Sequence, residues 1–302
     1  TLNAARRWIH VGPWTVQPSE EAKLALAVFL CGFAAADPER LKRFKTGFLP
    51  AFAAVGLTCA AILVEPDVGT AIFIGLVMTM TLVVAGVRGT HLAPCLSGAA
   101  IAACYYALTH TEHVRARWDA YLHPELDPLG KGHQILQSLT ALGSSGWTGD
   151  GLGRGTAKLY FLPEAHSDFI FSVLGQEMGF LGAAAVLLLY VALGAAGYRI
   201  MFRAKDQFGF LLAFSLTTYI ILQAAVNVAV VTQAIPTKGI PLPFVSAGGS
   251  SIVFTLAGVG MLVNIANSSE RGTWSEGVSA SCSPAAARAA MSSPASPSPS
   301  IS

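Results

Sequence analysis

Charged residues are scarce in this sequence. Only 12% of its 302 residues are Asp, Glu, Lys or Arg, whereas soluble globular proteins carry roughly 25%. Apolar residues make up 53% of the chain, and its mean hydropathy is +0.55. This composition excludes a water-soluble globule and indicates a membrane protein. The 30 glycines, without any run of alternating ten-residue strands, favour an all-α bundle packed through small residues over a lipid-facing barrel.

Other absences remove further classes of protein. A net charge of +2, spread along the chain, argues against nucleic acid as a partner. The five cysteines form no CxxC pair and no disulfide framework, so we expect them to be packing residues. The chain does not open with a basic stretch followed by a short apolar segment, so a cleaved signal peptide is not expected.

Seven apolar runs are long enough to cross a hydrocarbon core of about 30 Å as helices. Basic residues lie in the loops after the first, third and fifth runs, which the positive-inside rule places in the cytoplasm. Alternation then puts the N-terminal loop, the turn at 65–67, a long loop at 110–168 and a proline-rich stretch at 234–247 outside. The seven runs are residues 22–36, 48–64, 70–86, 90–109, 176–198, 208–233 and 248–267.

The domain organisation follows from these runs. Residues 1–269 form one membrane domain with the large outer loop 110–168. Residues 270–302 are mostly Ser, Pro and Ala, which cannot bury enough surface to fold, so we expect a disordered cytoplasmic tail. The six glycines between residues 143 and 155 fit no phosphate-binding spacing. A flexible surface loop is therefore the preferred interpretation there.

Acidic and basic side chains stand out on the predicted outer face. Asp168 lies where the chain re-enters an apolar run, as a helix cap or a functional group. Asp67 follows Glu65-Pro66, which indicates a capping residue in a turn. Glu20 and Lys23 are three residues apart and share a helix face. With basic residues of the N-terminal loop they could line an anion site, or Lys23 could simply extend to the membrane interface.

A segment with three prolines, residues 236–251, completes the set. Proline forbids a regular helix there, and non-helical backbone near lipid is tolerated only where it is packed in protein or lines a cavity. We therefore expect this segment to line a cavity.

Five motifs resemble, in order and spacing, the SEDS family of cell-shape and division proteins. They are NAARRWI (3–9), QPSEEAK (17–23), EPDVGT (65–70), LPEAHSDFIF (162–171) and PTKGIPLPFVSAGGSS (236–251). The resemblance covers about residues 1–269, and the PEAH and PTKG variants are more similar to the FtsW-like division and sporulation members than to the RodA-like elongation members. One departure is Ala247, where the family carries a tyrosine.

The resemblance implies a ten-helix protein of the bacterial cytoplasmic membrane that acts at the division septum. Such a protein polymerises lipid II into glycan strands outside the membrane, with a class B penicillin-binding transpeptidase and other division proteins as partners. By this comparison about three spans would precede residue 1, and we expect the 302-residue chain alone to be inactive or unstable.

The same resemblance implies roles for individual residues. Glycan extension needs a general base for a sugar hydroxyl, and Asp168 fits that role. The leaving diphosphate needs cations, which Arg6, Arg7, Lys23 and Lys238 would supply. No organic cofactor is expected, although a divalent cation (Mg or Mn) could share this task. The remaining residues assigned to substrate binding are Glu20, Asp67, Ser246 and Ser250.

Two alternatives belong to other classes. A lipid II flippase would need polar groups through both leaflets, but here they gather in the outer third. A non-catalytic division scaffold would leave Asp168 and Lys238 without a role.

Overall fold

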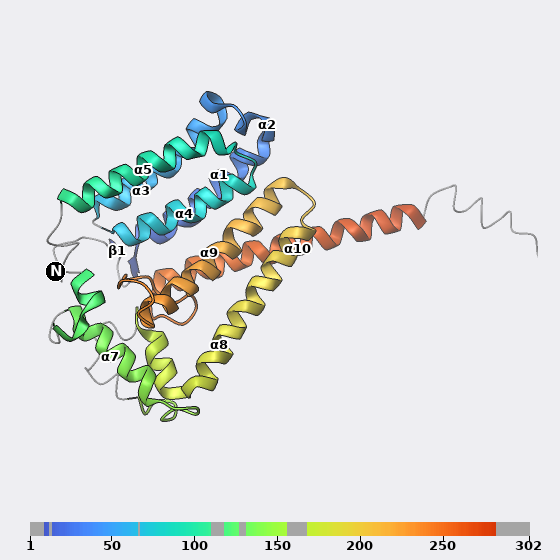
Figure 1. Ribbon diagram of the computed structural model, residues 1–302. Coiled ribbons are helices and arrows are strands. Elements are labelled where there is room, and N and C mark those ends of the chain that lie inside the picture. The colour runs from blue at the N-terminus through green and yellow to red at the C-terminus, as the bar shows by residue number, and fades with distance from the viewer. Residues whose placement is uncertain are drawn as a thin grey trace, which may run out of the picture.

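The fold is a bundle of seven long helices in the described part of the chain (Figure 1). The computed structural model describes residues 9–11, 14–65, 67–109, 118–126, 131–155 and 168–281. Each predicted apolar run lies largely within one helix, which confirms the predicted all-α membrane fold. The helices are α1 (Pro18–Ala36), α3 (Leu49–Val64), α4 (Val68–Val84), α5 (Gly89–Thr109), α8 (Ile170–Arg203), α9 (Gln207–Val231) and α10 (Gly249–Ser281).

Within the described ranges, four helical stretches have the length and apolar composition to cross a membrane. They are Phe44–Val64, Ile170–Arg203, Gln207–Val231 and Gly249–Ser269, and the shorter apolar helix Val68–Val84 accompanies them. Only about 17–25 apolar residues are needed to span the hydrocarbon core. The chain is therefore a multi-pass membrane protein.

Shorter elements lie in segments that were predicted as loops. The strands β1 (Ile9–Val11) and β2 (Trp14–Val16) form an antiparallel hairpin in which Ile9 pairs with Val16. The long loop 110–168 contains the 14-residue helix α7 (Lys131–Ser144) and the 3-10 turn η2 (Pro124–Leu126). The helix α2 (Pro38–Leu41) and the π-helical turn η1 (Phe44–Phe48) precede α3.

The connections alternate between two ends of the bundle (Figure 1). The basic end carries the connections 37–48, 85–88 and 204–206. The other end, here called the site end, carries Glu65 and Asp67, the connection 232–248 and the first turn of α1. This alternation agrees with the arrangement predicted from the basic loops.

Helix α9 is the central helix of the bundle. It packs against α8, α1, α4 and α10. In its most apolar 18-residue window 61% of the residues are buried inside the protein, against 22% in the corresponding window of α8. Asp206 caps the start of α9 by accepting a hydrogen bond from the Gly209 amide at 2.9 Å.

Helix α8 is broken at Gly179, where φ is 68° and ψ is −170°. The glycine-rich loop 145–155 pairs with the backbone groups at the break through four hydrogen bonds. The amides of Asp150 and Gly151 donate to α8 carbonyls, and α8 amides donate to the carbonyls of Gly146 and Trp147. A β-carbon at Gly149 or Gly179 would lie 2.4 Å from backbone atoms of the other segment. The stretch is a surface loop, as predicted, with Trp147 and Leu152 70% and 77% exposed, but its glycines also permit a close backbone contact with α8 that was not predicted.

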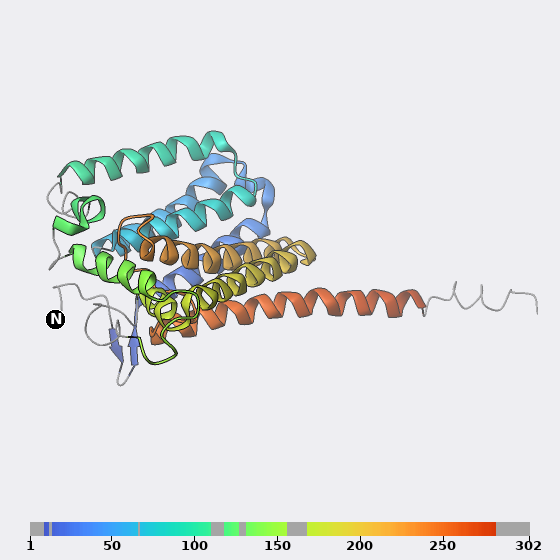
Figure 2. The ribbon, with the colours of Figure 1, turned by 60° about the horizontal axis from the view of Figure 1, so that its bottom comes forward.

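Helix α10 is longer than the sequence indicated. Its 33 residues continue to Ser281, so at ~1.5 Å per residue it is about 50 Å long. Figure 2 shows it projecting from the bundle. The structure differs here from the disordered tail expected to begin at residue 270, and residues 282–302 lie outside the described part of the chain.

Candidate functional site

Asp168 and Lys238 meet at the site end of the bundle. Asp168 lies in the turn before α8, and Lys238 lies in the non-helical connection that follows α9. A β-carbon added at Gly239 would be 2.7 Å from Asp168 Oδ2, so the carboxylate lies directly against the backbone of this connection. The proline-rich segment and the re-entry point, 70 residues apart in sequence, therefore form one site.

The start of α4 joins this site through Gly69. A β-carbon at Gly69 would lie 3.4 Å from Lys238 Cδ and 3.7 Å from Asp67 Oδ1. Asp67 caps α4, accepting hydrogen bonds from the Thr70 amide at 3.2 Å and from the Thr70 hydroxyl at 2.8 Å. The prediction of a capping Asp67 is confirmed, and the same residue borders the lysine.

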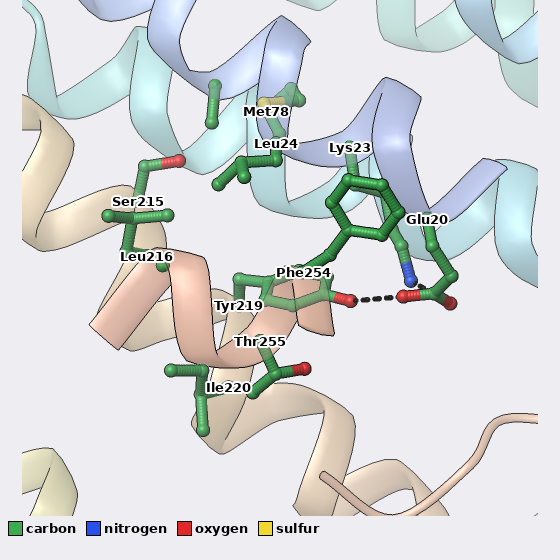
Figure 3. A pocket seen from close by; sticks show the side chains of 12 residues that line it. Glu20, Lys23, Leu24, Met78, Ser215, Leu216, Tyr219, Ile220, Phe254 and Thr255 are labelled. Atoms are coloured by element: carbon green, nitrogen blue, oxygen red, sulfur yellow. Dashed lines mark hydrogen bonds and ion pairs between the residues drawn. The ribbon is translucent and has the colours of Figure 1, made fainter. Parts of the chain in front are cut away.

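Glu20 and Lys23 form a buried ion pair at the start of α1. Their side chains are 4% and 5% exposed, and Lys23 Nζ lies 2.5 Å from Glu20 Oε1. The Tyr219 hydroxyl of α9 donates to Glu20 Oε2 at 3.2 Å, and Lys23 Nζ lies 4.9 Å from the centre of the Tyr219 ring (Figure 3). Asp67 is close enough to interact electrostatically with Lys23. Lys23 therefore points inward rather than extending to the surface of the bundle.

A narrow pocket opens beside this pair, between α1, α4, α9 and α10 (Figure 3). The cavity itself is small, about 20 Å³, which is room for one ordered water. Glu20, Lys23 and the Tyr219 hydroxyl gather on one side of it, and apart from Ser215 and Thr255 the rest of the lining is apolar (Figure 3). The lining residues are Glu20, Lys23, Leu24, Ala27, Met78, Ser215, Leu216, Tyr219, Ile220, Phe254, Thr255 and Gly258.

Side chains of the central helices hold the non-helical connection in place. On α9, Gln223 Nε2 donates to the Pro241 carbonyl at 2.7 Å, and Asn227 Nδ2 donates to the Ile240 carbonyl at 2.8 Å. From α8, the Tyr190 hydroxyl donates to the Pro243 carbonyl. The sequence interpretation missed all three side chains. Their signal was present, because Gln223 and Asn227 are amides four residues apart inside a span, where polar side chains are costly.

The two predicted serines play different parts. Ser246 is 2% exposed, and its hydroxyl accepts the Leu242 amide at 2.7 Å, so it stabilises the turn. That turn also holds Phe244 at a φ of 66°, a left-handed conformation that costs an aromatic residue about 1–2 kcal/mol. Ser250 lies in the first turn of α10 at 6% exposure, and its hydroxyl has no hydrogen-bond partner among the described residues.

The described residues do not test the predicted roles of Arg6, Arg7 and a divalent cation. Arg6 and Arg7 lie outside the described residues. For a metal, no group of three or more His, Cys, Asp or Glu side chains occurs in the ranges that the structure describes. These side chains do not make a protein cage for Mg²⁺ or Mn²⁺, although Mg²⁺ bound mainly through substrate phosphates needs only one or two carboxylates.

The comparisons with known proteins concern the chain as a whole and point to one family. The sequence model of the FtsW/RodA/SpoVE family, described as "Cell cycle protein", matches residues 1–271. The chain is 41% identical over 265 residues to a probable peptidoglycan glycosyltransferase FtsW of Geobacter sp. strain M18, covering 88% of this chain and 72% of that protein. It is 40% identical over 265 residues to stage V sporulation protein E of Bacillus subtilis strain 168, covering 87% and 72%.

Solved structures give the same result for the fold. A chain from a peptidoglycan synthase complex, solved in a study of how polymerization and crosslinking are coordinated, superposes with a TM-score of 0.69 at 26% identity, covering 89% of this chain and 75% of that one. The rod shape determining protein RodA of Thermus thermophilus gives a TM-score of 0.59 at 25% identity, covering 88% and 71%.

Proposed function

The chain belongs to the FtsW/RodA/SpoVE family of cell cycle proteins, and from this premise we propose that it is a peptidoglycan glycosyltransferase that polymerises lipid II. The observation that carries the proposal is the contact of the Asp168 carboxylate with Gly239, the residue next to Lys238. This contact brings a base and a cation together at the end of the bundle predicted to face outward.

Asp168 acts as the general base. The 4-hydroxyl of one lipid II attacks the anomeric carbon of a lipid-linked glycan, and the carboxylate accepts the hydroxyl proton as the new glycosidic bond forms. The bond to undecaprenyl diphosphate breaks, and this group leaves as an anion that needs no proton. A positioned base of this kind contributes about 10²–10⁴-fold.

Lys238 and Lys23 balance the charge of the diphosphate. Lys238 borders the base through Gly239, and Lys23 lines the neighbouring pocket. The first turn of α10 adds the positive end of a helix dipole, with the buried Ser250 hydroxyl as a donor. Arg6 and Arg7 remain further cations of this proposal.

The lining of the pocket beside Lys23 combines the polar and apolar chemistry that a lipid with a charged head requires. Glu20, Lys23 and Tyr219 line its polar side, and residues such as Leu24, Met78 and Phe254 line its apolar side. A polyprenyl diphosphate combines these two chemistries in one molecule. We propose that the diphosphate binds beside Lys23, at the polar side of this pocket, and that the polyprenyl chain follows the apolar side chains next to it.

The setting of this activity is also proposed. The relative named FtsW and the solved peptidoglycan synthase complex support a class B transpeptidase partner, other division proteins and a septal site in the cytoplasmic membrane. Mg²⁺ or Mn²⁺ could assist on the diphosphate, and no organic cofactor enters the scheme.

The flippase alternative fits the charge distribution less well. Its substrate would pass both ends of the bundle, but the buried ion pair lies at the site end. Between the two ends, the buried side chains of α1, α3, α4 and α9 in the described ranges are apolar or uncharged, with Thr81 and Ser215 among the uncharged polar ones. A scaffold would require neither the buried pair nor the pocket.

The test uses the complete protein, purified with its transpeptidase partner in detergent micelles, and fluorescent lipid II. Glycan strands separated by gel electrophoresis are the expected product. Micelles enclose no compartment, so lipid II transport cannot be measured in them. Strand formation in micelles would therefore show polymerisation and exclude a protein that only transports lipid II. If no strands form, while the same protein accelerates lipid II movement across sealed vesicles, the proposal is overturned in favour of the flippase.

A further inference from the structure

We infer that Asn227 is a positioning residue that fixes Asp168 relative to Lys238. The inference rests on the proposed function, because it assigns a purpose to the arrangement of these two groups. Asn227 lies on the central helix α9, is 1% exposed and is not part of the pocket.

One amide group joins the two halves of the site. Asn227 Nδ2 donates to the backbone carbonyl of Asp168 at 2.8 Å and to the backbone carbonyl of Ile240 at 2.8 Å. Both partners are carbonyls, which only accept hydrogen bonds, so the nitrogen of the amide must face them. Its two hydrogens suffice for the two contacts. Asn227 therefore links the re-entry turn before α8 to the connection after α9.

The link continues directly to the functional side chains. The Ile240 amide donates to the Lys238 carbonyl at 3.0 Å, which fixes the local turn of the lysine. Gly239, between these two residues, is the contact surface of the Asp168 carboxylate. A shift of either carbonyl at Asn227 would therefore change the distance between base and cation, although Asn227 touches neither reacting group.

Backbone chemistry explains why an amide is needed here. Pro241 and Pro243 lack amide hydrogens, and the connection is not helical, so it cannot satisfy its own carbonyls by a regular ladder. Gln223, four residues before Asn227 and 0% exposed, likewise donates a hydrogen bond to the Pro241 carbonyl. Among the described residues, the Gln223 side chain donates a hydrogen bond only to the connection, whereas Asn227 donates to both sides. The pair thus provides an internal comparison.

The experiment measures lipid II polymerisation by the full chain with its partner, separating kcat from KM. The variants are Asn227→Leu, Gln223→Leu and the control Thr217→Val. Thr217 is buried on the same helix, and its hydroxyl has no hydrogen-bond partner in the described part of the chain. Folded protein is quantified for each variant by size exclusion and thermal unfolding.

We expect Asn227→Leu to lower kcat by about 10- to 100-fold, since a misplacement of about 1 Å can cost that much. KM for lipid II should stay within about twofold, because the diphosphate and lipid contacts are intact. Gln223→Leu should lower kcat several-fold less, and Thr217→Val should match wild type. Asn227→Ser, a smaller side chain with one donor, is measured in parallel and should show the same kcat-selective loss if the leucine variant does not fold.

Two outcomes overturn the inference. In the first, folded Asn227→Leu or Asn227→Ser retains wild-type kcat. In the second, the Asn227 and Gln223 variants lose activity equally and only in proportion to their thermal stability. Asp168→Asn in the same assay distinguishes a failure of the proposed function from a failure of the positioning role. If Asp168→Asn remains active, the proposed general base is wrong. If it is inactive while an Asn227 variant is fully active, only the positioning role of Asn227 fails.

Discussion

Two ion pairs of the same sequence pattern lie at opposite ends of the bundle. Glu20–Lys23 at the site end and Glu39–Lys42 at the basic end both have i,i+3 spacing and an N–O distance of 2.5 Å. The first pair is 4% and 5% exposed, and the second is 73% and 42% exposed. The Glu-x-x-Lys spacing alone therefore does not predict a functional ion pair, because burial decides whether the pair is a solvated surface pair or part of a site.

The same contrast extends to the backbone at the two ends. At the basic end short connections join helices, and the charged residues there face outward. At the site end the backbone is irregular, and buried side chains from α8 and α9 satisfy its carbonyls. Irregular backbone of this kind persists in a membrane protein only where protein groups pair with it. The site end is therefore the part of the molecule that should be sensitive to small changes.

The largest effect is expected at Gly179, and Gly86, which also has a positive φ, is its comparison. Gly179→Ala places a β-carbon 2.4 Å from the Gly149 amide nitrogen and 2.5 Å from the Trp147 carbonyl oxygen. This should destabilise the protein by more than about 5 kcal/mol and prevent folding. Gly86→Ala, at the basic end, meets no atom within 4 Å at a φ of +94°, so it should cost only about 1–2 kcal/mol. Yield and thermal unfolding in detergent measure both, and equal losses would contradict the contrast.

The two ion pairs provide the next test. Glu20→Gln leaves Lys23 buried without its main counter-charge and should lower the free energy of unfolding by about 3–5 kcal/mol. Glu39→Gln breaks an exposed pair and should change it by about 0–1 kcal/mol. Unfolding in mixed detergent and SDS micelles gives both values. A small effect of Glu20→Gln would show that the buried pair is solvated in the bilayer.

A smaller effect is expected from single lysines. Lys238→Met keeps the side-chain stem and deletes the charge, and a contact to a charged group is worth about 1.5–3 kcal/mol, or roughly 10- to 150-fold in rate. The turnover number should fall by this factor, more than the affinity for lipid II does. Lys205→Met at the basic end should leave turnover unchanged. Wild-type turnover in folded Lys238→Met would remove Lys238 from the site.

Much of the fold could be predicted from the sequence. A bilayer requires long apolar helices, so all seven predicted runs coincide with helices. The cap at Asp67 was equally predictable, because it depends on neighbours within three residues. Sequence patterns are reliable where structure depends on local composition or on the membrane itself.

The missed features depend on contacts between distant segments. The glycines of 145–155 indicated only a flexible surface loop. Their backbone contact was missed because the partner is the broken turn of α8 some 30 residues later. Gln223 and Asn227 were not predicted to have a role, because their partners are carbonyls of a segment with no regular structure. Helix α9 has a hydropathy of 1.8 and α8 of 2.1, so hydropathy alone did not identify the central helix.

The most direct test of the account compares the same substitution at the two ends of the bundle. Asp168→Asn removes the proposed base without changing its shape, and Asp206→Asn makes the same change at the cap of α9, where asparagine caps equally well. Strand synthesis from purified lipid II is measured for both variants in the full chain with its partner. The account predicts a fall of about 10²–10⁴-fold for Asp168→Asn and wild-type synthesis for Asp206→Asn. Near wild-type synthesis by folded Asp168→Asn would contradict it.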